Sequence, residues 1–234
     1  MATVLLVRHG RSTANTEGIL AGRTPGVRLD DAGLAQAAET AARISQLPVV
    51  AVVSSPLERC VQTADAVAAA LKDPVLVQTD ERLTECGYGD WTGRPLKTLA
   101  KESLWKAVQA HPSGVTFPGG ESMRDMQARG VAAIRDWDGT LTDQHGDGAI
   151  WVVSSHADVI KAIVADALGM HLDHFQRIVI DPASVSAITY TPSRPFVVRY
   201  NEHGPLDSLI PPKRPRRRSR KSASSDAVIG GGAG

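Results

Sequence analysis

Two histidines and two arginines stand close behind strand-sized apolar stretches of this sequence: Arg8, His9, Arg59 and His156. Cationic side chains that share one site repel each other unless an anion lies among them. The guanidinium group of arginine offers a planar fork of donors that matches phosphate oxygens, and it stays charged at all relevant pH values. The set therefore predicts a phosphate-binding site in which a histidine is available for chemistry.

The apolar stretches in front of these residues are typical of strands that are buried on both faces. Residues 3–7, 49–53 and 150–153 are aliphatic runs without polar alternation. Helical patterns separate them, which favours parallel pairing through right-handed crossovers, with helices on both faces of the sheet. We therefore expect an α/β fold with a mostly parallel central sheet, a three-layer α/β/α sandwich. Open sheets of this class bind ligands beyond the carboxyl ends of their strands, where the four residues are predicted to meet.

The remaining elements follow from periodicity and from helix start and stop signals. Asp30 or Asp31 is a candidate N-cap of the first long helix, and Pro48 ends it. The helices are expected at residues 30–48, 56–71, 123–141 and 159–168, and a final pair of strands at the sheet edge is expected at residues 184–190 and 196–200.

Two sequence motifs carry a resemblance to a known family. Residues 6–15, LVRHGRSTAN, resemble the signature of the histidine phosphatase superfamily, in its phosphoglycerate mutase-like branch, where an Arg-His-Gly triplet follows the first strand. Residues 54–64, SSPLERCVQTA, look like the second motif of that family, with Arg59 at its phosphate-binding arginine.

Three further motifs extend the resemblance over most of the chain. Residues 85–93, ECGYGDWTG, resemble the family's acid motif, in which a glutamate precedes a spaced Gly-x-Trp-x-Gly. The segments FPGGES at 117–122 and VVSSHADVIK at 152–161 complete the set. Five motifs in the right order, over roughly residues 1–200, are far more specific than the short Arg-His-Gly triplet alone.

The resemblance implies a role for each matching position. His9 would attack phosphorus and become a phosphohistidine, which requires an unprotonated ring nitrogen, and Arg8 and Arg59 should disfavour its protonated form. The two arginines, with His156 as a cation, would offset the charge on the transferred phosphoryl group. Glu85 would protonate the leaving oxygen and later accept a proton from water, which requires a raised pKa.

Three more positions are expected to contact substrate by the same resemblance. Asn15 lies at an additional phosphate-contacting position of the family, and Gly22 and Ala157 lie near positions of substrate contact. Relatives commonly have an uncharged or apolar residue where this chain has Asp158, which is expected to alter the charge near the far end of the substrate. Other specificity-determining side chains are expected in residues 95–116.

The favoured function is hydrolysis of a phosphate monoester on a phosphorylated small molecule. Family mutases share the catalytic positions but carry an extra insertion that covers the site, and residues 93–118 are too few to resemble it. A phospholigand-binding module that has lost turnover is a further alternative. It would be expected to lack His9 or Glu85, and both are present. We expect no cofactor and no metal, since His9, His156 and Glu85 lack the additional ligands of a metal motif such as HExxH.

Charge is distributed unevenly along the chain. Residues 211–234 hold seven Lys and Arg against one Asp, so the rest of the chain carries a net charge of −5 within an overall +1. We predict a catalytic domain at 1–210 and a basic, disordered tail at 211–234, which is a candidate for weak contact with nucleic acid or an anionic surface. The oligomeric state is left open by the sequence.

The location is expected to be cytoplasmic. The sequence begins without a basic flank or a small-residue cleavage pattern, and its apolar runs are far shorter than the roughly 20 residues that cross a bilayer. The two cysteines, Cys60 and Cys86, match neither a zinc ribbon nor a CxxC motif, which fits a reducing compartment.

Overall fold

A computed structural model describes residues 1–210, and the predicted tail lies outside the described residues. The centre of the fold is one six-stranded sheet with strand order β3-β2-β4-β1-β5-β6. The first four strands of the chain run parallel, whereas β5 pairs antiparallel with both β1 and β6. The strands are β1 (Thr3–Arg8), β2 (Val49–Ser54), β3 (Val77–Thr79), β4 (Ile150–Ser155), β5 (Val185–Tyr190) and β6 (Pro195–Glu202).

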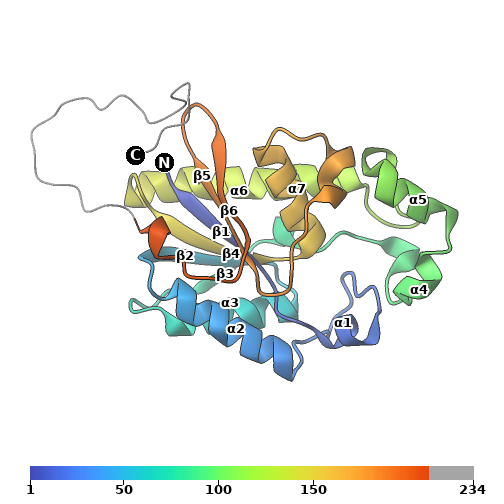
Figure 1. Cartoon of the computed structure of the whole chain (residues 1–234), viewed down its shortest axis with the longest axis horizontal. Helices are drawn as coiled ribbons and strands as arrows, with labels where there is room; N and C mark the ends of the chain where they lie inside the picture. Colours follow the sequence, from blue (N-terminus) through green and yellow to red (C-terminus); the bar gives the residue numbers. More distant parts are fainter. Residues whose placement is uncertain (211–234) are drawn as a thin grey trace, which may run out of the picture.

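Helices cover both faces of this sheet, which confirms the predicted α/β sandwich (Figure 1). The long helices α2 and α3 lie on one face, and α6 and α7 lie on the other. The helices are α1 (Thr13–Glu17), α2 (Asp31–Ile44), α3 (Glu58–Ala70), α4 (Leu96–Leu99), α5 (Ser103–Ala110), α6 (Met123–His145) and α7 (Ala157–Ala167).

Alternation along the strands divides the core into two layers. Leu5 and Val7 of β1 pack with residues of α2 and α3 in one buried cluster, whereas Val4 and Leu6 belong to the cluster that includes α6 and α7. All four side chains are fully buried. A continuous aliphatic run is therefore needed at β1, because successive side chains point to opposite faces and both faces are covered.

The four predicted helices are present, but several boundaries differ: α2 ends at Ile44, before Pro48, and α6 continues to His145. The short helices α1, α4 and α5 were not predicted. Asp30 caps α2, since its side chain accepts a hydrogen bond from the Gly33 amide at 2.8 Å. Helix α3 begins at Glu58, two residues later than predicted, because Pro56 lies in the turn that leaves β2. Strand β3 was not predicted, since its three residues are partly or fully exposed and carry no apolar pattern.

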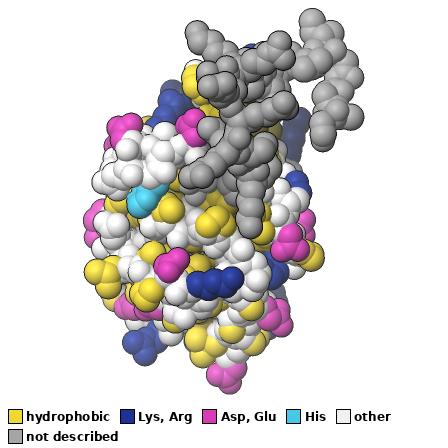
Figure 2. All heavy atoms as spheres, turned by 90° about the vertical axis from the view of Figure 1, so that its left-hand side faces the viewer, with side chains coloured by type: hydrophobic (Ala, Val, Ile, Leu, Met, Phe, Trp, Pro, Cys, Tyr) yellow, Lys and Arg dark blue, Asp and Glu magenta, His cyan; other side chains and the backbone are white. Residues whose placement is uncertain are grey.

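On the face of the molecule near the start of β1, the visible surface is neither mainly positive nor mainly negative. Around the tail atoms, charged side chains of both signs are scattered among hydrophobic ones (Figure 2). Within residues 1–210, no helix has the length and hydropathy needed to cross a membrane.

Candidate active site

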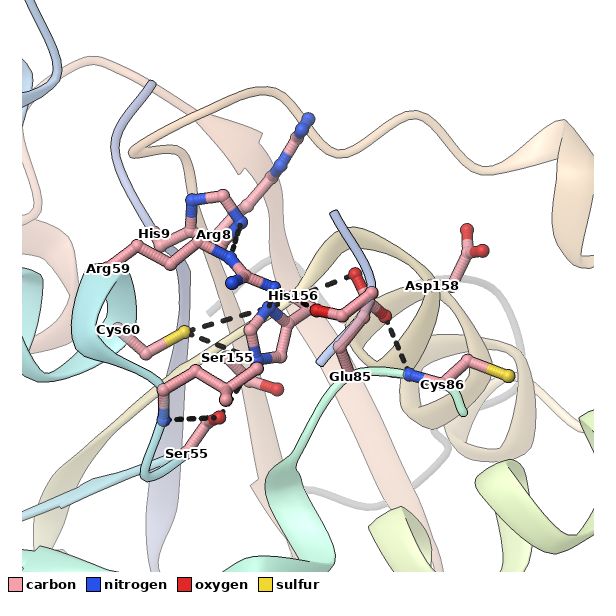
Figure 3. A network of polar contacts seen from close by, with 12 residues as sticks. Arg8, His9, Ser55, Arg59, Cys60, Glu85, Cys86, Ser155, His156 and Asp158 are labelled. Atoms are coloured by element: carbon pink, nitrogen blue, oxygen red, sulfur yellow. Dashed lines mark hydrogen bonds and ion pairs between the residues drawn. The ribbon is translucent and has the colours of Figure 1, made fainter. Parts of the chain in front are cut away.

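Strands β1 and β4 bring the two predicted histidines together. Arg8 at the end of β1 is in register with Ser155 at the end of β4, so the residues that follow, His9 and His156, leave the sheet side by side. Their ring centroids lie 5.3 Å apart, and the ring planes are inclined by 62°. Figure 3 shows both rings with the Arg59 side chain at the carboxyl edge of the sheet.

The His9 ring is held with one nitrogen directed at Arg59. Its Nδ1 donates to the Gly10 carbonyl at 2.7 Å, and its Nε2 accepts from Arg59 Nε at 3.3 Å. Burial, Arg59 and Arg8 hold the pKa of His9 well below 6.5, in the predicted direction. The ring is therefore neutral near pH 7, and Nε2 carries the lone pair that a nucleophile needs.

Arg59 lies in the first turn of α3, 1% exposed, and joins the parts of the site. Its Nη2 donates to the Gly22 carbonyl at 2.8 Å and lies 3.2 Å from His156 Nδ1. Its Nη1 is buried without a hydrogen-bond partner among the described residues, and so is Nε of Arg8. Buried donors without acceptors are costly, so these nitrogens indicate that the site is built to receive an anion.

The charge of His156 is set by its buried surroundings. Its Nε2 lies 2.8 Å from Ser55 Oγ, and its Nδ1 faces Arg59 Nη2. Burial and the positive charge of Arg59 hold the pKa of His156 well below 6.5. His156 is therefore neutral in the site without an anion, whereas the predicted cationic form concerns the site with a phosphoryl group bound and stays a prediction.

Glu85 approaches the histidines from the loop that follows the short 3-10 helix Glu81–Leu83. Its Oε1 accepts from the Cys86 amide at 2.9 Å, and its Oε2 lies 3.8 Å from His156 Nδ1. Burial, followed by the negative charge of Asp158, raises the pKa of Glu85 to about 7. A substantial fraction of this carboxyl group is therefore protonated at neutral pH, as a general acid requires.

Three residues without a predicted role hold the Glu85 backbone. Arg23 Nε and Arg129 Nη2 both donate to the Glu85 carbonyl, at 2.8 and 3.1 Å. Glu121 of the FPGGES motif binds both arginines and accepts from the Gly87 amide at 2.9 Å. Sequence reasoning recognised the motif but assigned Glu121 no function, because nothing in the spacing says which segment it contacts.

The backbone of the acid motif (residues 85–93) packs directly against the backbone of the FPGGES segment (residues 117–122). A Cβ atom at Gly89, where φ is +52°, would lie 2.1 Å from the Pro118 carbonyl oxygen. A Cβ atom at Gly120 would lie 2.2 Å from the Gly87 carbonyl oxygen. Glycine is required at both positions, and the close approach fixes the loop that carries Glu85.

These residues surround a cavity of about 190 Å³. Seven of the eight predicted site residues line it: Arg8, His9, Asn15, Gly22, Arg59, Glu85 and Ala157. The eighth, His156, is fully buried behind the wall, where it contacts Arg59 and lies 3.8 Å from Glu85. Asn15 turns its Oδ1 to the Ser12 amide and hydroxyl at the start of α1, at 3.0 and 2.9 Å. Its amide nitrogen is then the group that remains for an anion.

The segment 95–116 contributes less to the cavity than predicted. Leu96 is the one residue of that segment among the described residues lining the cavity. Lys97, Lys101 and Lys106 are exposed and line no part of it. Tyr88, from which sequence reasoning drew nothing, lines the cavity and donates to Asp158 Oδ2 at 2.8 Å.

Two other features of the described residues bear on the chemistry. Cys60 Sγ lies 3.4 Å from His156 Nε2, and burial raises the pKa of its thiol to about 12, so it stays protonated. Within residues 1–210, no three His, Cys, Asp or Glu side chains are grouped in a way that would hold a metal ion.

A neutral histidine, two arginines and a protonatable carboxyl group, placed at the carboxyl edge of an α/β sheet, are suited to phosphoryl transfer. The model of the histidine phosphatase superfamily (branch 1) matches residues 4–203. The chain therefore belongs to the histidine phosphatase superfamily.

Similar proteins carry both mutase and phosphatase names. The probable phosphoglycerate mutase GpmB of Yersinia pestis is 29% identical over 195 residues, which cover 82% of this chain and 87% of that protein. A mycobacterial glucosyl-3-phosphoglycerate phosphatase has a similar structure, with a TM-score of 0.76, 22% identity, and coverage of 85% and 98% of the two chains. A phosphoserine phosphatase of Entamoeba histolytica has a TM-score of 0.75, 23% identity, and coverage of 87% and 98%. The two solved structures share the fold.

Proposed function

We propose that this protein is a phosphatase that hydrolyses a phosphate monoester through a phosphohistidine on His9. The observation that carries the proposal is the pairing of two features in one cavity. The neutral His9 ring presents Nε2, and beside it the buried Arg59 Nη1 has no acceptor among the described residues. A phosphoryl group between them would accept a hydrogen bond from Arg59 and place its phosphorus beside His9 Nε2.

In the first step, His9 Nε2 forms a bond to phosphorus while the bond from phosphorus to the ester oxygen breaks. Arg8 and Arg59 offset the charge on the phosphoryl oxygens, the Asn15 amide nitrogen is placed to contact them, and His156 supports Arg59 from behind the cavity wall. The Glu85 carboxyl proton passes to the leaving oxygen, which departs as an alcohol. An anion among these groups would also raise the pKa of His156 and favour its cationic form.

In the second step, water attacks the phosphohistidine. The Glu85 carboxylate accepts one proton of that water as the new oxygen–phosphorus bond forms and the bond to His9 Nε2 breaks. Inorganic phosphate leaves, and the site returns to a neutral His9 with a protonated Glu85. The cycle consumes one water and releases one alcohol and one phosphate.

The short cover over the cavity supports transfer to water. Residues 93–118 form two small helices, α4 and α5, and only Leu96 of this segment lines the cavity among the described residues. A mutase must keep water away from its phosphohistidine. A cover that reaches the cavity with one side chain is poorly suited to that task.

The proposed substrate is a phosphorylated small molecule, since the cavity volume of about 190 Å³ fits a metabolite. Two solved structures of the same fold are named as phosphatases. We also propose a cytoplasmic location, because both cysteines are free and buried. A catalytic domain at 1–210 and the roles of the individual site residues are likewise proposals.

Phosphate release from p-nitrophenyl phosphate in EDTA tests the proposal. The wild-type chain should release phosphate, and His9→Ala should lower the rate by at least about 10³-fold because the nucleophile is gone. His145→Ala, which removes an exposed histidine at the end of α6, is the matched control and should retain the wild-type rate. Equal rates for wild type and His9→Ala would refute the mechanism.

A second candidate, a phosphoglycerate mutase, is favoured by the name of the Yersinia pestis relative. A mutase would interconvert 3-phosphoglycerate and 2-phosphoglycerate with little release of phosphate. Phosphorus NMR of a reaction that starts from 3-phosphoglycerate separates the two functions. Accumulation of the isomer, without inorganic phosphate, would favour the mutase.

A further inference from the structure

One side of the cavity carries a charge that phosphate binding does not use. Asp158, the second residue of α7, lines the cavity beyond Glu85 (Figure 3). Its side chain is 21% exposed. A half-buried carboxylate in an anion-binding site opposes the binding of that anion. We therefore expect the carboxylate to interact favourably with another part of the substrate.

Asp158 is held in place by neighbours that leave its charge in the cavity. Tyr88 donates its hydroxyl proton to Oδ2 at 2.8 Å, and burial raises the pKa of Tyr88 well above 10, so it remains a donor. Lys161 lies one turn along α7, with Nζ 3.6 Å from Oδ1, and does not line the cavity. Asp158 itself lines the cavity, and its negative charge is one cause of the raised pKa of Glu85.

The cavity offers no second cation to a substrate. Among the described residues lining it, the cations are Arg8 and Arg59, the two groups already assigned to the phosphoryl group. The lining also includes Asp158, Tyr88 and the apolar side chains of Ile19, Leu20 and Leu96. A carboxylate or second phosphate on the leaving group would therefore meet a carboxylate and hydrocarbon, with no arginine or lysine to pair with.

We infer that Asp158 selects the substrate of the proposed phosphatase. The preferred phosphate ester has a leaving alcohol without a second anionic group, and that alcohol presents hydroxyl or ammonium donors to the Asp158 carboxylate. This inference rests on the proposed function. It separates this chain from the phosphoglycerate and phosphoserine in the names of the Yersinia pestis relative and the two solved structures, since both compounds carry carboxylates.

The test compares three small esters with the full-length protein: glycerol 3-phosphate, O-phosphoethanolamine and 3-phosphoglycerate. Phosphate release gives kcat/KM for each. Wild type should prefer the first two over 3-phosphoglycerate by about tenfold or more, which corresponds to about 1.4 kcal/mol of discrimination. The two preferred esters distinguish hydroxyl from ammonium donors.

Asp158→Asn removes the charge with little change of shape and should reduce the preference by about tenfold, through a gain on 3-phosphoglycerate. Asp158→Ser serves as a second variant should the first fold poorly. Tyr88→Phe removes the hydrogen bond but keeps the carboxylate, so it should keep the wild-type ratio. The compared quantity is the ratio of kcat/KM values for two esters at the same pH. An effect of Asp158 on the protonation of Glu85 changes both values alike and cancels in this ratio.

Three outcomes would overturn the inference: a wild-type preference for 3-phosphoglycerate, an unchanged ratio in both Asp158 variants, or an equal loss of preference in Tyr88→Phe. Failure of the proposed function looks different. In that case the wild-type chain would release no phosphate from p-nitrophenyl phosphate or from any of the three esters.

Discussion

The side chains of the site control each other's protonation. His9 is neutral because burial and two arginines disfavour its cation, and Glu85 holds a proton because burial and Asp158 disfavour its anion. A nucleophile without a proton and an acid with one thus coexist near neutral pH. Exchanging their protonation states would leave neither group able to perform the first step.

The pH profile of kcat/KM should report these two groups. Activity should fall above pH 7, about tenfold per unit, as Glu85 loses the proton that it gives to the leaving oxygen. The acidic limit should lie well below pH 6.5, where His9 becomes protonated. The measurement is the rate for an alkyl phosphate at several pH values.

Glu85→Gln should lower that rate by about 10²- to 10⁴-fold and should remove the fall above pH 7. The loss should be smaller with p-nitrophenyl phosphate, whose leaving group needs no proton. A fall above pH 7 that persists in Glu85→Gln would assign the titration to another group.

At the scale of elements, strand ends place one half of the site and loop packing places the other half. β1, β4 and α3 deliver His9, His156 and Arg59 directly from regular structure. Glu85 depends instead on the contacts of its loop with Glu121 and Arg129. The acid is thus the part of the site most sensitive to changes elsewhere in the chain.

Glu121→Gln should therefore reduce both activity and stability. It removes a charge that is 15% exposed and holds Arg23, Arg129 and the Gly87 amide. Hydrogen bonds between charged groups contribute about 1.5–3 kcal/mol, so the free energy of unfolding should fall by about 2 kcal/mol. Because Glu85 would be displaced, kcat should fall more than KM rises.

Urea denaturation and steady-state kinetics check this prediction. Glu102→Gln is the matched control, since it breaks an ion pair with Arg94 whose partners are 36% and 40% exposed. Such surface pairs contribute about 0–1 kcal/mol. Equal effects of the two substitutions would show that the Glu121 contacts do not hold the acid loop.

For the molecule as a whole, the buried site makes stability depend on pH. The pKa values of His9 and His156 are lowered in the folded chain, so below pH 6.5 the unfolded chain binds two protons that the folded chain does not. Glu85 has the opposite effect between its ordinary pKa of 4.5 and its folded value of about 7, where only the folded chain keeps the proton.

The two histidines outweigh the one carboxyl group. Each shifted group changes the free energy of unfolding by about 1.4 kcal/mol per pH unit. Since the histidines of the unfolded chain are half protonated at pH 6.5, stability should fall by about 1 kcal/mol between pH 6.5 and 5.5. Urea denaturation at pH 6.5 and 5.5 measures this slope.

His9→Ala removes one of the two opposing histidines, so its slope in that window should be close to zero. Wild-type stability that rises as the pH falls from 6.5 to 5.5 would contradict the predicted neutral histidines.

The sequence by itself determined the fold class and the composition of the site. Short uninterrupted aliphatic runs separated by helical patterns are typical of strands covered on both faces, and the polar residues that follow such strands meet where the parallel strands end. This reasoning placed Arg8, His9, Arg59 and His156 correctly in space. Strand β3 was not predicted, because three residues that are partly or fully exposed leave no apolar pattern.

Only the tertiary structure decided the charges and the contacts that cross between segments. The neutral state of His156 follows from dry packing against Arg59, and spacing along the chain carries no information about burial. The hydrogen bond from the Gly87 amide to Glu121 and the placement of Asp158 in the same cavity as the arginines likewise join residues far apart in sequence. Periodicity is a local property, whereas a pKa is set by everything that surrounds the group in three dimensions.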